Sequence, residues 1–365
     1  MAADNNDNNQ PKKTGFMAGF SKAVREISAE IKKDLNNAPP PKAGEGSGYK
    51  TPDHLVKAVS AAQSGLAFVE TPAEPGATIP QAPLQPHNFN VKPLNPWQAL
   101  RESGSQKKFA TDAYYHAYTP ADLAHYVRQL PQGVPTVSLL CAEAGDELLL
   151  EGFQATLRAV PSLFGATGFS PRNLQPDADT LDTTLTELLN NNPKILAVGP
   201  VGLDLTYTSH NLAQQAEQMT RQLEIAADFG LPALVFQNGA LTELRDILEQ
   251  GISLPQKLVW LKPIQTEAEL EFIQEYNFYV AFRAEITWPK ETFYREAVRQ
   301  ILPHRWLAGS GNSLKSTHNR AGHFNSAAGM NEIIDTLAEL LKVDVNALKE
   351  RLNMNFAAVY GPAAA

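Results

Sequence analysis

The sequence is poor in cysteine, with Cys141 as the single thiol among 365 residues. One thiol can form neither an intramolecular disulfide nor the paired-cysteine knuckle of a zinc site. No apolar run approaches the roughly 18 residues that a membrane-spanning helix needs. Residues 1–13 lack the apolar core of a secretion signal. We therefore expect a cytoplasmic protein with no transmembrane segment.

The chain also lacks an excess of positive charge. Its 31 Lys and Arg residues are outnumbered by 39 Asp and Glu residues, which gives a formal net charge of −8. General nucleic-acid binders usually carry a basic face, so the composition gives no strong nucleic-acid signal, although a local basic patch stays open. The sequence also contains no Walker, dinucleotide-binding, Ser-His-Asp or cysteine-nucleophile pattern.

Residues 1–105 have the composition of a partly disordered, partly helical extension. Residues 1–15 are polar, and the proline-rich stretch over 71–98 favours an extended tether. The apolar residues of 16–35 recur three or four apart, which predicts an amphipathic helix. This helix could pack on the main domain, on a protein partner or on an anionic membrane surface. Because it has no Trp and its charges are mixed in sign, we favour a protein partner.

From about residue 106, strand-like apolar runs alternate with amphipathic helical patterns. In the clearest unit, 194–239, two short apolar runs flank a long helix that ends at Gly230, and this order makes the two strands parallel. The predicted strands are 109–117, 134–141, 163–169, 195–199, 233–236, 257–261, 278–283 and 305–309. Helical patterns lie between them, and two more follow over 330–341 and 345–352. Eight such units in about 250 residues predict a (β/α)8 TIM barrel over 106–361, with an open doubly wound sheet as the alternative.

Two motifs resemble those of a known family. The segment GPVGLD (199–204), followed by QxxxMxxQLEIAADFGLPALVF (215–236), is similar to the TatD family of metal-dependent hydrolases. The resemblance covers about residues 109–361 and includes Asn325 and the closing segment 355–361. It implies a TIM barrel with a Zn²⁺ or Mg²⁺ site at the carboxyl ends of its strands, and a hydrolase activity of the deoxyribonuclease type.

The residues at the family's metal-binding positions nevertheless depart from its pattern. The resemblance places these positions at Tyr114, His116, Pro200, Phe236, Leu261 and Ser310. A catalytic metal site needs several imidazole or carboxylate donors that converge on one point. His116 keeps its imidazole, whereas Pro200, Phe236 and Leu261 have no side-chain donor. The resemblance therefore implies a degenerate site without a metal cofactor, in which His116 and Asp204 are the residual catalytic candidates.

A weaker signal follows the last predicted strand. TIM barrels often bind phosphate on backbone N–H groups and a basic side chain in this region. The loop there is glycine-rich and contains basic residues, so we consider a ligand site formed by Ser310, Gly311, Asn312, Lys315 and His318. The alternative is a flexible loop that covers the vacated pocket.

Three functions follow from these features. The first is a catalytically inactive TatD-like barrel that acts as a scaffold and binds a protein partner through the helix over 16–35. The second is a metal-dependent hydrolase, of the nuclease type, with a remodelled active site. The third is a sensor that binds a small phosphate-bearing ligand at the barrel mouth.

Overall fold

A computed structural model describes residues 110–131, 136–206 and 212–361. The predicted extension over 1–105, with its amphipathic helix over 16–35, lies outside these residues. Within the described ranges, no helix has the length and apolar character needed to cross a membrane.

Strands and helices alternate along this part of the chain. The strands are β1 (Ala110–His116), β2 (Thr136–Glu143), β3 (Leu163–Gly168), β4 (Ile195–Asp204), β5 (Ala233–Asn238), β6 (Leu258–Trp260), β7 (Tyr279–Phe282), β8 (Trp306–Ala308) and β9 (Gly311–Asn312). The α-helices are α4 (Pro120–Arg128), α5 (Glu147–Ala159), α6 (Ala178–Asn191), α7 (Leu212–Asp228), α8 (Leu241–Glu249), α9 (Glu267–Glu275), α10 (Thr292–Ala297), α11 (Met330–Leu341) and α12 (Val345–Tyr360). Short 3₁₀ turns are η1 (Ala284–Thr287), η2 (Val298–Gln300), η3 (Pro303–Arg305), η4 (His318–Arg320) and η5 (Ala327–Gly329).

The strands form a parallel sheet that closes into a ring. Their order is β8-β7-β6-β5-β4-β3-β2-β1-β9, and only Gly309 and Ser310 separate β8 from β9 in the chain. One short segment therefore pairs with β7 at its start and with β1 at its end. We call the place where the segment over 306–312 meets β1 the seam of the barrel. A Cβ atom on Gly309 would lie 2.8 Å from the backbone N and O of Tyr114, so the two backbone segments approach closely there. The closed ring confirms the predicted TIM barrel and excludes the open sheet.

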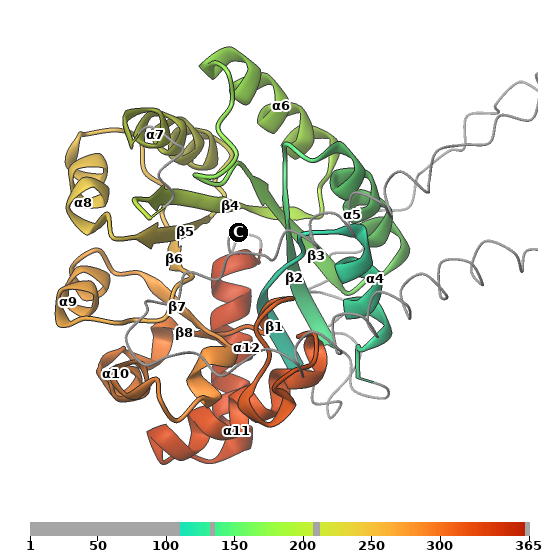
Figure 1. Cartoon of the computed structure of the whole chain (residues 1–365), viewed down its shortest axis with the longest axis vertical. Coiled ribbons are helices and arrows are strands. Elements are labelled where there is room, and N and C mark those ends of the chain that lie inside the picture. The colour runs from blue at the N-terminus through green and yellow to red at the C-terminus, as the bar shows by residue number, and fades with distance from the viewer. Residues whose placement is uncertain (1–109, 132–135, 207–211, 362–365) are drawn as a thin grey trace, which may run out of the picture. The chain divides into compact units, whose positions relative to one another are not determined.

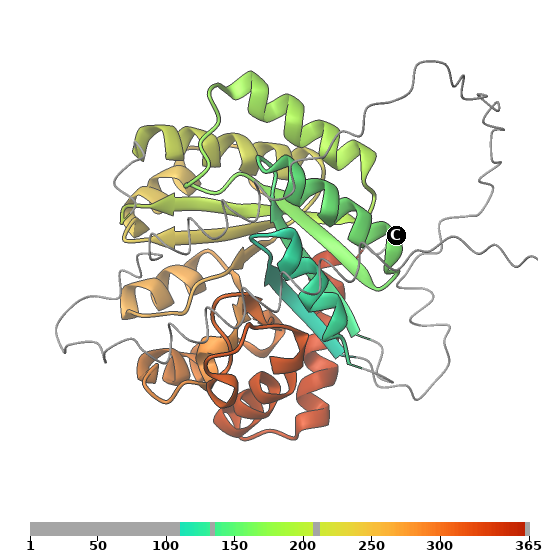
Figure 2. The same cartoon turned by 45° about the vertical axis from the view of Figure 1, so that its right-hand side comes forward.

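Helices α4 to α11 follow one another around the outside of the ring, whereas α12 crosses the middle of the view in Figure 1 (Figure 2 shows the same elements turned by 45°). Helix α12 is held near the starts of two strands. Thr111 Oγ1 donates to Asn353 Oδ1 at 3.0 Å, and Asn355 Nδ2 donates to the Trp306 carbonyl at 2.8 Å. Tyr360 Oη also donates to the Ala113 carbonyl at 3.1 Å. Helix α12 thus covers the amino-terminal end of the barrel, and the opposite end carries the site positions.

The core has an inner and an outer layer because side chains alternate across each strand. On β2, Val137, Leu139 and Cys141 join the inner cluster, while Leu140 and Ala142 join the cluster between strands and helices. The inner cluster also takes in residues of α12. The barrel is therefore a packed core with an apolar floor beneath its carboxyl end.

Two predicted boundaries were wrong. The Gly199-Pro200 pair was expected to end the fourth strand, but β4 continues through the cis Gly199–Pro200 peptide to Asp204. Proline lacks the backbone N–H that would donate a hydrogen bond to a neighbouring strand. The missing hydrogen bond disturbs the pairing with β5 only locally, because the register shifts between Val198 and Val201 and pairing then resumes. Helix α12 runs beyond residue 352 to Tyr360, because its apolar residues continue at helical spacing into the barrel floor.

Candidate functional site

The six positions that the family resemblance singled out lie on strands or just after them. Tyr114 and His116 are in β1, Pro200 is in β4 and Phe236 is in β5. Leu261 directly follows β6, and Ser310 is the second residue after β8. Tyr114 and Leu261 are buried members of the inner apolar cluster. At these two positions the side chains therefore extend the barrel core. Among the described residues, no group of three or more His, Cys, Asp or Glu side chains could hold a metal ion.

Asp112 binds the two sides of the barrel seam together. This fully buried carboxylate accepts hydrogen bonds from Ser310 N at 2.8 Å and from Ser310 Oγ at 2.7 Å. It also accepts from Tyr126 Oη at 2.7 Å. Burial raises the pKa of Asp112 to about 6, against the lowering effect of these donors. The Ser310 carbonyl is in turn bound by Asn325 Nδ2. Both Asp112 and Ser310 are therefore committed to joining β1 to the segment between β8 and β9.

His116 is buried between two tyrosines. Its Nδ1 lies 3.2 Å from Tyr114 Oη, and its ring stacks on Tyr118 at a centroid distance of 4.4 Å. Burial, and then the nearby positive charge of Arg283, lower the pKa of His116 to about 4, so the ring is neutral at pH 7. Its Nε2 is buried and has no hydrogen-bond partner among the described residues.

Arg283 brings a buried positive charge to the same end of the barrel. It follows β7, and its Nη2 donates to Glu285 Oε1 at 2.8 Å in a pair whose side chains are 10% and 6% exposed. Burial disfavours the charge, but Glu285 and neighbouring tyrosines outweigh this effect and raise the pKa of Arg283. Its Nε atom is buried without a hydrogen-bond partner in the described part of the chain.

A second polar network surrounds Asp204 at the end of β4. Its carboxylate accepts from Arg172 Nη2 at 2.8 Å, Asn238 Nδ2 at 3.0 Å and Thr206 Oγ1 at 2.6 Å. Burial would raise the pKa of Asp204, but these donors lower it below its usual value. Lys262 Nζ extends the network by donating to Asn238 Oδ1 at 3.0 Å. These contacts organise the loops after β4 and β5.

The loop after β8 makes its polar contacts within the chain. Gly311 and Asn312 pair with β1, and Asn312 Oδ1 accepts from the backbone N–H groups of Leu314 and Lys315, each at 3.0 Å. The Lys315 ammonium lies 3.6 Å from Glu291. His318 packs edge-on against Trp288 at 5.2 Å between ring centroids. In the structure Ser310 therefore contacts Asp112, whereas Lys315 and His318 contact residues next to α10 and η1. The ligand site over 310–318 stays a prediction.

Three glutamines of α7 were not predicted to have a role. Gln215 Oε1 accepts from Asp204 N at 2.8 Å, and Gln222 Oε1 accepts from Phe169 N at 2.7 Å. Gln218 Oε1 accepts from Gln175 N at 2.8 Å. The three side chains are buried and bind the backbone where β3 and β4 end. Their signal in the sequence is polar residues three and four apart on an otherwise apolar helix face.

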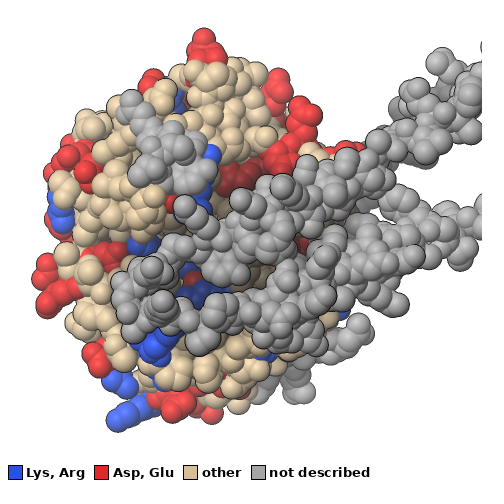
Figure 3. Space-filling model, viewed as in Figure 1, with Lys and Arg blue, Asp and Glu red and all other residues tan. Residues whose placement is uncertain are grey.

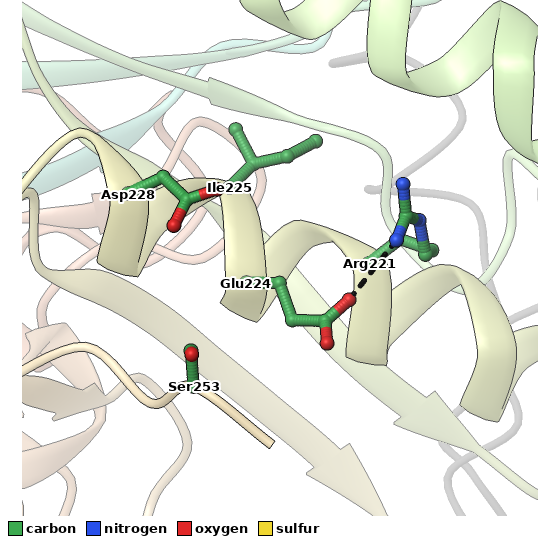
Figure 4. Close-up of a pocket in the computed structure, with 5 residues that line it drawn as sticks. All are labelled: Arg221, Glu224, Ile225, Asp228 and Ser253. Atoms are coloured by element: carbon green, nitrogen blue, oxygen red, sulfur yellow. Dashed lines mark hydrogen bonds and ion pairs between the residues drawn. The ribbon is translucent and has the colours of Figure 1, made fainter.

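Charges of both signs lie on the surface as well. Figure 3 shows basic and acidic atoms around the rim and near the centre of the face in view. A separate pocket lies on the outside of the ring, where α7 meets the chain before β6 (Figure 4). It is lined by Arg221, Glu224, Ile225, Asp228 and Ser253. Arg221 is paired there with Glu224 at 3.1 Å and with Asp182.

A closed barrel with polar side chains where its strands end has the architecture of the TIM-barrel proteins, whose active sites lie at that end. A family model described as TatD related DNase matches residues 132–361, and the chain belongs to this family. Over 184 residues the chain is 23% identical to the uncharacterized metal-dependent hydrolase YabD of Bacillus subtilis (strain 168). The matched region covers 49% of this chain and 69% of that protein.

Solved structures share the fold. The TatD homolog YJJV of Escherichia coli K12 superposes with a TM-score of 0.61 at 20% identity, over 70% of this chain and 99% of that one. A TatD family hydrolase of Entamoeba histolytica gives a TM-score of 0.54 at 14% identity, over 71% of this chain and 100% of that one. At these identities the superpositions establish the barrel, and the chemistry depends on the residues of this chain.

Proposed function

We propose that this chain is a TatD-family barrel without metal-dependent hydrolase activity, and that it serves as a protein-binding module. The observation that carries this proposal is the set of side chains at the family's metal positions. Only one of the six, His116, is an imidazole or carboxylate. Tyr114 and Ser310 are poor ligands while protonated, and Pro200, Phe236 and Leu261 have no donor.

The surroundings of His116 also do not fit a divalent cation. A metal-bound histidine needs further anionic or imidazole ligands close by, whereas the charged neighbour that acts on His116 is the guanidinium of Arg283. Asp112 is the acid next to Ser310, and its oxygens already bind donors across the seam. A bound metal would acidify a water molecule for hydrolysis, and these residues supply no coordination shell for it.

This proposal predicts a silent enzyme. The purified full chain, assayed with a generic phosphodiester in added Zn²⁺, Mg²⁺ or Mn²⁺, should hydrolyse it no faster than the buffer blank. Metal analysis should find well under one ion per chain. The alternative, a remodelled nuclease, requires metal-dependent turnover that His116→Ala abolishes. The matched control is His304→Ala, which removes an exposed imidazole in η3, at the start of β8 and away from the candidate site.

The protein-binding role depends on the extension, for which the sequence pattern is the support. The apolar positions of 16–35 would form one face of a helix, as in helices that lie in a partner's groove. A charge placed on that face should prevent docking because it would have to be buried unpaired. The TatD-related barrel would then be the body that this arm attaches to its partner.

We therefore expect the full chain to lose its partner on substitution of Val24→Asp together with Ile27→Asp. Proteins that copurify with the tagged wild-type chain should fall at least about tenfold in quantitative mass spectrometry. Lys32→Asp, a charge change at a polar position of the same segment, should retain them. Recovery of the same proteins with the double variant would refute a role for this helix.

A further inference from the structure

Several buried side-chain N and O atoms have no hydrogen-bond partner among the described residues, and two of them lie on basic side chains where β1 and β7 end. These two are Arg283 Nε and His116 Nε2, on side chains that belong to residues 8% and 5% exposed. Leaving a buried polar atom without a partner is energetically costly, so each such atom calls for an explanation. Such atoms at the active-site end of a TIM barrel indicate a ligand.

His116 lies in β1 and Arg283 directly follows β7, the two strands on either side of the segment over 306–312, and the guanidinium is close enough to lower the pKa of the imidazole. Gly311 is the register partner of Tyr115 in β1, and Asn312 is that of His116. A Cβ atom on Gly311 would lie 3.5 Å from Cβ and 3.7 Å from Cδ of Arg283. The aliphatic part of Arg283 therefore packs against Gly311, the residue that pairs with Tyr115 of β1, and a glycine leaves room for it there.

The chemistry of the pair favours an acceptor with more than one oxygen. Arginine N–H groups bind carboxylate oxygens strongly because the bond is charge-assisted. If Tyr114 Oη donates to Nδ1, as at 3.2 Å it can, the proton of neutral His116 lies on Nε2, which is then a second donor. One oxygen of a carboxylate could accept from each group.

The acidic residues near Arg283 favour a ligand with a single negative charge. Glu285 already neutralises Arg283, and Glu143 at the end of β2 adds negative charge close to Tyr114 and Tyr118. A dianion would be repelled by these carboxylates more strongly than a monoanion. Tyr118, which stacks on His116 and is 42% exposed, lies between that ring and solvent.

We propose that the mouth of this barrel binds a small organic carboxylate, whose oxygens accept hydrogen bonds from Arg283 Nε and His116 Nε2. The site goes beyond the proposed function and rests on it in one respect, namely that no metal occupies the mouth. The ligand is then bound by N–H donors and not by a metal ion. The ligand is held by hydrogen bonds and is not transformed.

The test is a thermal and calorimetric titration of the full chain in EDTA at constant ionic strength. Acetate and propionate are the carboxylate probes, inorganic phosphate is the competing oxyanion, and chloride is the salt control. At a concentration about 100 times Kd, a carboxylate should raise Tm by about 5 °C. Chloride should give no saturable rise, and phosphate should bind more weakly than acetate.

The variants separate binding from folding. Replacing both Arg283→Gln and Glu285→Gln removes the ion pair together, so no charge is left buried alone, and Kd should rise at least tenfold. Arg221→Gln is the matched control, because that arginine is paired with Asp182 and with Glu224 on the outside of the ring, the second pair being drawn in Figure 4. The titration should be unchanged in this variant. If the double variant misfolds, the ¹H–¹⁵N signals of arginine Nε groups in the wild-type chain give a second measurement, in which acetate should move one signal.

The outcomes distinguish the two proposals. An absence of saturable binding by any carboxylate, or equal binding by wild type and double variant, overturns the carboxylate site and leaves the proposed function standing. Tighter binding of phosphate than of acetate overturns the assignment to a monoanion. Anion binding that appears only when Zn²⁺ is added contradicts both proposals.

Discussion

Replacing Asp112 with alanine should lower the free energy of unfolding by about 3 kcal/mol. Two donors on Ser310, its N–H and its hydroxyl, would be left buried without their acceptor, at about 1–3 kcal/mol each. Tyr126 would lose less, because its hydroxyl can still bind Ser138 Oγ at 2.8 Å. Part of the loss would be offset because a buried carboxylate is no longer desolvated. Denaturant unfolding of the full chain at pH 7 measures the difference.

Two further variants test this account of Asp112. Asp182→Ala, which removes a partly exposed partner of Arg221, should cost within about 1 kcal/mol. Asp112→Asn tests the charge itself. Because the pKa of Asp112 is about 6 in the fold and 3.8 as the ordinary value, the folded protein binds more protons between these pH values. The stability from this group therefore falls as pH rises from about 4 to about 6, and the Asn variant should lack that decline. An identical pH dependence in both proteins would contradict the burial of a titrating carboxyl.

Replacing Gly202 with alanine should cost more than 4 kcal/mol, or yield no folded protein. An added Cβ would lie 1.6 Å from the Phe236 carbonyl oxygen and 2.6 Å from its carbon. These are backbone atoms of the neighbouring strand β5, so no side chain can turn aside. The clash can be relieved only by moving β4 away from β5, which breaks the backbone hydrogen bonds between the two strands. Overpacking of this kind is among the few mechanisms that lower the free energy of unfolding by so much. Expression yield, circular dichroism and denaturant unfolding report the effect.

Gly230→Ala is the control that shows how much of the loss at Gly202 comes from the steric clash and how much from an unfavourable backbone conformation. Gly230 ends α7 at a φ of +64°, and an added Cβ there would meet no atom within 4 Å. The expected cost is only that of a left-handed residue, about 1–2 kcal/mol. Similar losses for the two variants would mean that the approach of β4 to β5 is looser than the structure indicates.

The repeat of strands and helices made most of the barrel predictable from the sequence. A parallel pair such as the one in 194–239 is fixed by local patterns, because an intervening helix leaves no other pairing. Closure was harder to predict, since it depends on Gly309 and Ser310 joining β8 to a strand at the other end of the domain. The boundary at Gly199-Pro200 failed because proline predicts a break, whereas the pairing around it sustains the strand.

The sequence could predict those site residues that belong to a family motif. It could not predict roles that depend on contacts between residues far apart in the chain. The sequence located Tyr114, His116 and Ser310, but it could not show that Asp112 binds Ser310. Arg283 belongs to none of the motifs that the sequence contains. Nothing near Arg283 in the sequence reveals that its aliphatic part packs against Gly311, because that contact exists only after the ring has closed.

The seam between the first and last strands also dictates an order of events during synthesis. Asp112 and Ser310 are 198 residues apart in sequence. Until the ribosome has produced residues 306–312, β1 has one edge without a partner, and such edges invite pairing with other chains. At typical translation rates of roughly 5–20 residues per second, this wait lasts some 10–40 s. The emerging domain is therefore most exposed to aggregation while its fold is nearly complete, and the last few residues of the ring end that exposure.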